Sequence, residues 1–121
     1  MDNLSSKHCL PCEGGVPPLD PETIQKHLKH LGKEWKTSAD CKTIFKDFHF
    51  KNYYQTMAFV NALAWMAHRE NHHPDLEVGY NHCRVQYTTH AAQGLTENDF
   101  ICAHQVESLN APLEQAQCGL K

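Results

Sequence analysis

Apolar side chains recur with the period of an α-helix between residues 21 and 31. Ile24, Leu28 and Leu31 fall on one side of such a helix. Asp20 precedes it and is followed by a proline and an acid, an order typical of an N-cap and a first helical turn. The pattern therefore predicts a short amphipathic helix over residues 21–31.

Two segments that alternate between apolar and polar residues come next. The first covers residues 34–37 and the second residues 43–50, with a polar stretch that favours a turn at residues 38–40. The apolar side of the second segment consists of Ile44, Phe48 and Phe50. We expect these segments to pair as two antiparallel strands.

A longer apolar segment with helical spacing follows Asn52, which can serve as an N-cap. Its predicted apolar stripe consists of Tyr53, Met57, Val60, Ala64 and Ala67. The apolar surface is widened by Phe59, Leu63 and Met66. We expect the helix to end near Glu70, because a proline follows at position 74. The wide surface has two interpretations: one broad core face, or a face of which part contacts a second subunit.

The next residues alternate twice more, with a turn predicted at Asn81-His82, and this pattern is typical of a β-hairpin. The apolar positions of its first strand are Leu76, Val78 and Tyr80. Those of its second strand are Cys83, Val85, Tyr87 and Thr89. The opposite, polar side of the second strand carries Arg84, Gln86, Thr88 and His90.

A loop over residues 91–95 leads to the last helix, whose start is marked by a capping box from Thr96 to Asp99. The predicted buried stripe of this helix is Cys102, Ala103, Val106, Leu109 and Leu113. The expected order is therefore α-β-β-α-β-β-α. It predicts an α+β fold in which helices pack on one face of a four-stranded antiparallel sheet.

Length and composition place these elements in one domain. The chain has 121 residues, and residues 1–18 are polar and rich in glycine and proline, so we expect a flexible arm before a single domain over 19–121.

The net charge is -3 and the 11 Lys and Arg are scattered, which argues against direct binding of nucleic acid. Without a membrane-spanning apolar run or a secretory signal pattern, we expect a cytoplasmic protein with no membrane contact.

Six cysteines are present, and in a cytoplasmic protein we expect them to be free thiols. Cys9 and Cys12 have the C-x-x-C spacing of zinc and redox sites. No second pair at ligand spacing follows, and no βαβ pattern surrounds them. The sequence favours a non-catalytic arm that binds metal incidentally, if at all.

Three histidines flank the predicted hairpin: His72 and His73 enter it, and His90 leaves it. Entry and exit of a hairpin lie side by side, so the three can converge on one cleft. Pro74 favours extended backbone at His73, and neighbouring side chains on extended backbone point in opposite directions. Imidazole both donates and accepts protons near neutral pH, which suits general acid-base catalysis.

Two other interpretations of these histidines stay open. Taken alone, a histidine on a polar strand face is usually a solvated residue, and a histidine pair before a proline is more often part of a loop than a catalytic dyad. Histidines also bind metals. Against a metal site, the chain has no H-E-x-x-H motif and no carboxylate placed as an obvious third ligand. Asp99 is explained fully by its place in the capping box.

With these residues assembled, the sequence resembles the pterin-4a-carbinolamine dehydratase family, also called 4a-hydroxytetrahydrobiopterin dehydratases. The family signature is an acid, Lys or His, then His-[His or Asn]-[Pro, Cys or Ser], an aromatic residue, His or Trp, and Asp, at defined spacings. The signature is matched by residues whose spacings all fall within the family's ranges: His68, His72-His73-Pro74, Tyr80, His90 and Asp99. The similarity covers residues 20–110.

The resemblance implies removal of water from a 4a-hydroxytetrahydropterin to give the quinonoid dihydropterin, without a metal or redox cofactor. This reaction recycles the cofactor of aromatic amino acid hydroxylases, to which the protein would be functionally coupled. By resemblance, His72, His73 and His90 are catalytic, the first two as a proton-transfer pair and the third positioning or assisting. The expected substrate-binding or orienting residues are Pro74, Asp99 and His68. Where His68 stands, the family often has Glu.

The resemblance also carries an alternative function. Animal members of the family serve as a dimerisation cofactor of a homeodomain transcription factor through their helices, and the apolar surface of residues 53–69 suits such docking. The same surface suits self-association, and relatives are dimers or tetramers, so we expect a homodimer or homotetramer. A third hypothesis is a metal-binding protein that uses the histidines with Cys9 and Cys12.

Overall fold

The computed structural model describes residue 9, residues 17–32 and residues 34–119, with side chains up to residue 109. Its elements are α1 (Pro21–Leu31), β1 (Lys36–Thr37), β2 (Ile44–His49), α2 (Tyr53–Glu70), β3 (Asp75–Val78), β4 (His82–Tyr87), the 3₁₀ helix η2 (His90–Ala92) and α3 (Glu97–Gly119). The predicted order of helices and strands is confirmed, with η2 as an addition before the last helix.

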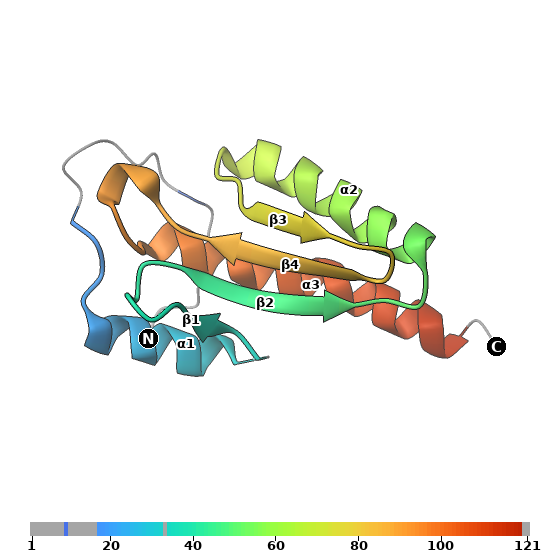
Figure 1. The fold of residues 1–121 in the computed structure, drawn as a ribbon, viewed down its shortest axis with the longest axis horizontal. Coiled ribbons are helices and arrows are strands. Elements are labelled where there is room, and N and C mark those ends of the chain that lie inside the picture. Colours follow the sequence, from blue (N-terminus) through green and yellow to red (C-terminus); the bar gives the residue numbers. More distant parts are fainter. Residues whose placement is uncertain (1–8, 10–16, 33, 120–121) are drawn as a thin grey trace.

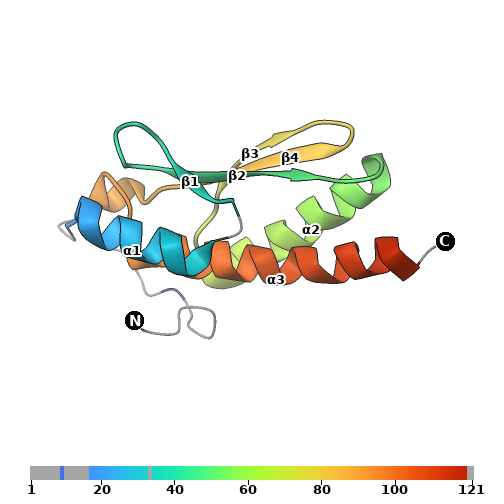
Figure 2. The ribbon, with the colours of Figure 1, turned by 90° about the horizontal axis from the view of Figure 1, so that it is seen from below.

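The four strands form one antiparallel sheet in the order β1-β2-β4-β3 (Figure 1). In the central pair, Ile44 of β2 lies opposite Tyr87 of β4, and His49 lies opposite His82. All three helices lie on the same side of the sheet (Figure 2). The α+β prediction is therefore confirmed, and the hairpin of β3 and β4 forms one half of the sheet.

The core lies between this sheet and the helix layer. The sheet contributes Ile44, Phe48, Cys83, Val85 and Tyr87 to it. The helices contribute mainly Ile24, Leu31, Phe59, Leu63, Met66, Phe100, Cys102 and Val106. The period-two pattern of β2 and β4 thus identified the inward face of the sheet, because alternate side chains of a strand point to the same side.

Capping residues at two helix starts also behave as predicted. The carboxylate of Asp20 accepts a hydrogen bond from the backbone N–H of Thr23 at 2.9 Å. The side-chain oxygen of Asn52 accepts one from the N–H of Gln55, also at 2.9 Å. Each bond satisfies a donor that the first helical turn leaves without a backbone partner.

The predicted apolar stripe of α2 is not the main buried face of the helix: Tyr53 and Ala64 are exposed, Met57 is half-buried, and Val60 is partly buried against the core. Of that set, only Ala67 is buried, and Tyr53 is 49% exposed. The buried residues of α2 are Thr56, Phe59, Leu63, Met66, Ala67 and Glu70. Two apolar stripes run side by side along this helix, and the core takes the one with the larger side chains, because burial stabilises in proportion to apolar area.

The strand predicted at residues 34–37 is shorter than expected, since β1 contains only Lys36 and Thr37. Trp35 is buried, and its indole N–H donates to the carboxylate of Glu107 on α3 at 2.8 Å. The ammonium of Lys46 lies 2.6 Å from the same carboxylate oxygen. Lys46 interrupts the apolar side of β2 because it pairs with a charge on the helix layer.

The hairpin turn lies slightly earlier than predicted, because His82 already belongs to β4. Tyr80 is in the turn and is 64% exposed.

Most of the predicted arm, including Cys12, and the side chain of Leu113 lie outside the described residues. The domain start near residue 19 stays a prediction. Leu19 is tied to the fold by its N–H, which donates to the carbonyl of Leu95 at 2.8 Å. Over the part of the chain that the structure describes, every helix is too short or too polar to cross a membrane.

Candidate active site

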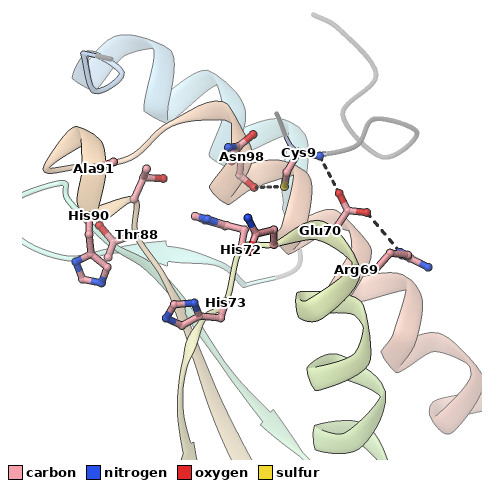
Figure 3. Close-up of a pocket in the computed structure, with 11 residues that line it drawn as sticks. Cys9, Arg69, Glu70, His72, His73, Thr88, His90, Ala91 and Asn98 are labelled. Carbon is pink, nitrogen blue, oxygen red and sulfur yellow. Dashed lines mark hydrogen bonds and ion pairs between the residues drawn. The ribbon is translucent and has the colours of Figure 1, made fainter. Parts of the chain in front are cut away.

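His72, His73 and His90 line one cleft of about 490 Å³ (Figure 3). The cleft lies where the end of α2, the exit of β4 and the first turn of α3 meet. Its other lining residues are Cys9, Arg69, Glu70, Asn71, Thr88, Thr89, Ala91 and Asn98. The predicted convergence of hairpin entry and exit is therefore present in the fold.

The end of α2 directs the histidine pair into this cleft. Asn71 has a left-handed backbone conformation (φ 53°), and its N–H donates to helix carbonyls, which is a common way to end a helix. The chain then turns away from the helix axis. The His72 side chain is 13% exposed, whereas His73 is exposed, so the two neighbours lie in different environments.

A buried carboxylate holds His72. Asp99 has no exposed surface, and its Oδ1 lies 2.7 Å from Nε2 of His72. Its Oδ2 accepts hydrogen bonds from the hydroxyl of Thr89 at 2.7 Å and from the N–H of Thr96 at 2.9 Å. The last bond is the acid's half of the predicted capping box. Asp99 thus caps α3 and contacts a cleft histidine at the same time.

The ring of Tyr87 lies against the same imidazole. The ring centroids of His72 and Tyr87 are 5.7 Å apart with an interplanar angle of 11°, which is a stacked arrangement. Tyr87 is fully buried, and burial raises the pKa of its phenol, so the ring stays neutral. The sequence predicts only that Tyr87 lies on the apolar, core-facing side of its strand. The alternating pattern does not indicate a contact with His72.

His90 reaches the cleft from the opposite edge. It begins η2, which two residues separate from the end of β4, and its side chain is exposed. The preceding residue Thr89 pairs with Gly94 in an isolated β-bridge, which closes the loop on which His90 lies. The position of His90 is therefore set by the backbone of this loop.

Two of the predicted orienting residues lie elsewhere. Pro74 and His68 line a second cleft of about 350 Å³, which shares His72 and His73 with the first. His68 is exposed, and its ring packs 5.9 Å from the ring of Trp65. The fold does not bring His68 into the cleft that the three histidines share.

Sequence reasoning did not place Glu70 or Cys9 in the cleft wall. Glu70 is only 8% exposed, and its Oε1 accepts a hydrogen bond from the N–H of Cys9 at 2.8 Å. Its Oε2 lies 3.5 Å from Nε of Arg69. A carboxylate two positions before the histidine pair could have marked Glu70, but no sequence signal predicts its contact with Cys9. Within the described residues, no group of three or more His, Cys, Asp or Glu side chains is arranged to hold a metal ion.

Together, fold and cleft define an α+β protein whose candidate active site is built from histidines at both ends of a hairpin. The chain belongs to the pterin 4 alpha carbinolamine dehydratase family, whose sequence model matches residues 17–109. A relative from Nitrosomonas europaea is 61% identical over 107 residues, which cover 88% of this chain and 93% of the relative. One from Nitrosospira multiformis is 58% identical over 109 residues, with coverage of 90% and 94%. The names of both assign them pterin-4-alpha-carbinolamine dehydratase activity provisionally.

Two solved structures have a similar fold. A transcriptional coactivator/pterin dehydratase from Brucella melitensis has a TM-score of 0.72 and 26% identity, covering 76% of this chain and 97% of that one. A pterin dehydratase-like protein identified as a RuBisCO assembly factor in the α-carboxysome has a TM-score of 0.58 and 25% identity, with coverage of 68% and 95%. The fold therefore occurs in proteins named for an enzyme activity and in proteins named for protein interactions.

Proposed function

We propose that this protein dehydrates 4a-hydroxytetrahydropterins by histidine acid-base catalysis. The observation that carries the proposal is the single cleft lined by His72, His73 and His90, with His72 bonded to the buried carboxylate of Asp99. Family membership supports the pterin substrate. The volume of the cleft is in the range typical of small-molecule sites.

The reaction removes a hydroxyl group from C4a and a proton from N5 of the pterin, which together leave as water. One group must therefore protonate the departing hydroxyl and another must accept the N5 proton. A histidine pair can do both near neutral pH, and neither step requires a metal or a redox cofactor. We assign these transfers to His72 and His73, with His90 as the positioning or assisting residue.

The contacts of His72 define what it can contribute. Its Nε2 is engaged by Asp99, so only Nδ1 remains to exchange a proton with a substrate. The carboxylate also stabilises the imidazolium that forms when Nδ1 accepts a proton. His73 and His90 are exposed in the cleft and have both ring nitrogens available for substrate or water within the described structure.

The proposed reaction also implies a partner enzyme and a cellular location. The product would be recycled as the cofactor of an aromatic amino acid hydroxylase, which makes functional coupling to such an enzyme part of the proposal. A cytoplasmic location follows from the sequence argument and belongs to the same proposal.

The test supplies 4a-hydroxytetrahydropterin, made in situ by an aromatic hydroxylase, and follows its ultraviolet decay with metal-free protein. We expect the wild type to accelerate the decay and His72→Ala, His73→Ala and His90→Ala each to lower the rate by about a hundredfold or more. His49→Ala is the matched control, because His49 is exposed and lies outside the cleft. A wild-type rate equal to the spontaneous rate would remove the catalytic proposal.

A second candidate function is protein binding through the outer face of α2. Tyr54 and Trp65 are 82% and 66% exposed on this helix, and large exposed aromatic residues are frequent at protein interfaces. We propose a second copy of the chain as the occupant, giving the homodimer or homotetramer expected from the sequence. Sedimentation of wild type and Trp65→Glu tests it: the variant should dissociate, and an unchanged mass would place the interface elsewhere.

A further inference from the structure

Two cysteines that are far apart in the sequence meet at the wall of the histidine cleft. The Sγ atoms of Cys9 and Cys102 lie 3.2 Å apart, although 93 positions separate the residues. Both thiols are free. The sulfur atoms of a disulfide are roughly 2.0 Å apart, so the pair has to close by only about 1.2 Å.

Cys9 is held in place by contacts besides its sulfur pair. Its N–H donates to Glu70 at the end of α2, and its thiol lies 3.6 Å from the carbonyl oxygen of Asn98 in the first turn of α3. Figure 3 shows Cys9 between these two residues at one side of the cleft. The bond to Glu70 uses the backbone of Cys9, so it can persist when the sulfur changes partner.

We propose that Cys9 and Cys102 form a reversible disulfide site in this cleft wall, oxidised by low-molecular-weight disulfides. The proposal goes beyond the dehydration reaction and does not depend on it. A second observation distinguishes this pair from the thiol of Cys83: Cys83 is buried in the core with its sulfur 4.0 Å from the backbone carbonyl oxygen of Arg84, and burial raises its pKa to about 11. Cys83 should therefore stay a thiol.

The exchange proceeds in two balanced steps. The thiolate of Cys9 attacks one sulfur of a small disulfide, forms a mixed disulfide and releases the first small thiolate. The sulfur of Cys102 then attacks the Cys9 sulfur, gives up its proton to water, and releases the second small thiolate. The two protein thiols thereby lose two electrons in total, and the small disulfide gains them and is reduced to two thiols.

Exposure sets the order of these steps. Cys9 is partly exposed, whereas Cys102 is fully buried on α3. The hydrogen bond with Cys9 and burial raise the pKa of the Cys102 thiol, which makes it the slower, second nucleophile. Oxidation fixes Cys9 covalently to α3, and reduction leaves it held by hydrogen bonds and packing contacts.

Cys12 offers the competing partner, because it has C-x-x-C spacing with Cys9. The test equilibrates the full-length protein with mixtures of reduced and oxidised glutathione, quenches with acid, and identifies linked peptides by tandem mass spectrometry. We expect a Cys9–Cys102 link in the wild type and equally in Cys12→Ser. Cys9→Ser, a change at a partly exposed position, should abolish it, and Cys83→Ser should not change it.

A thermal melt gives an independent measure. A link between residues so far apart should raise the melting temperature by about 5 °C or more, and a reductant should reverse the shift. The rise should be absent in Cys9→Ser and in Cys102→Ala. A Cys9–Cys12 link, or glutathione that remains on Cys9 while Cys102 stays a free thiol, would overturn the proposal.

Discussion

Asp99 Oδ1 lies 2.7 Å from His72 Nε2, and the same carboxylate caps the helix on which Asp99 lies. One buried group therefore fixes both the start of α3 and the orientation of a cleft histidine. Because the cap is local and the histidine is 27 positions away, this contact couples the formation of α3 to the assembly of the cleft.

Asp99→Asn separates these two roles. An amide still accepts from the N–H of Thr96 through its oxygen, but it does not stabilise an imidazolium at His72 as a carboxylate does. We expect dehydration to fall about tenfold to a hundredfold per folded molecule, with a stability loss of about 1–3 kcal/mol. Activity and urea unfolding are measured together. Thr96→Val is the control, since it keeps the backbone donor, and unchanged activity in Asp99→Asn would confine Asp99 to capping.

Tyr87 offers a test of the stacked ring beneath His72. Tyr87→Phe keeps an aromatic ring at that place, so we expect dehydration within about threefold of the wild type. Tyr87→Leu removes the flat surface and leaves His72 without its stacking partner; aromatic pairs contribute about 0.5–1.5 kcal/mol beyond buried area. We expect a loss of about tenfold in turnover for Tyr87→Leu, corrected for the folded fraction. Equal rates in both variants would show that stacking does not position the imidazole.

Local signals in the sequence predicted the fold well. Asp20 and Asn52 mark helix starts through contacts with residues three positions ahead, so the sequence alone displays both partners. The convergence of His90 with His72 followed from the geometry of one hairpin, which is also a local motif. Asp99 was predicted as a capping residue because its partner Thr96 is also only three positions away.

Contacts between distant elements were beyond such reasoning. The bond between Cys9 and Glu70 joins residues 61 positions apart, and nothing in either segment specifies it. His68 fits a family spacing, yet the rotation of α2 leaves it exposed. The same rotation decided which of two apolar stripes on α2 entered the core. Helix rotation depends on side-chain packing across the whole interface, which a single sequence does not display.

The buried face of α2 leads to a prediction about stability. Phe59 is fully buried and packs against Phe48 with ring centroids 4.8 Å apart. Phe59→Ala should therefore cost about 3–5 kcal/mol of unfolding free energy, through lost burial and a cavity. Tyr53→Ala changes a half-exposed aromatic residue of the same helix and should cost less than about 1 kcal/mol. Urea unfolding of both variants at one pH compares them, and similar losses would contradict the observed helix rotation.

The last prediction concerns acid sensitivity at the contact between α1 and α3. His104 on α3 packs 5.8 Å from the ring of His30 on α1. Burial, followed by the charge of His30, lowers the pKa of His104 below its usual 6.5, against an opposing effect of Glu107. The unfolded chain thus binds a proton at higher pH than the folded chain does. Stability should therefore be fully present above about pH 6.5 and fall as the pH drops toward the lower folded pKa.

His104→Gln removes this titration and keeps a polar side chain of similar length. We expect the urea midpoint of the variant to fall less than that of the wild type between pH 7.5 and pH 5.5. His49→Gln serves as the control, because it makes the same chemical change at an exposed residue outside the contact between α1 and α3. If His104→Gln and the wild type lose stability in parallel over this range, the acid sensitivity arises from other groups. In that case the contact of His104 with His30 contributes packing between α1 and α3 and no pH dependence.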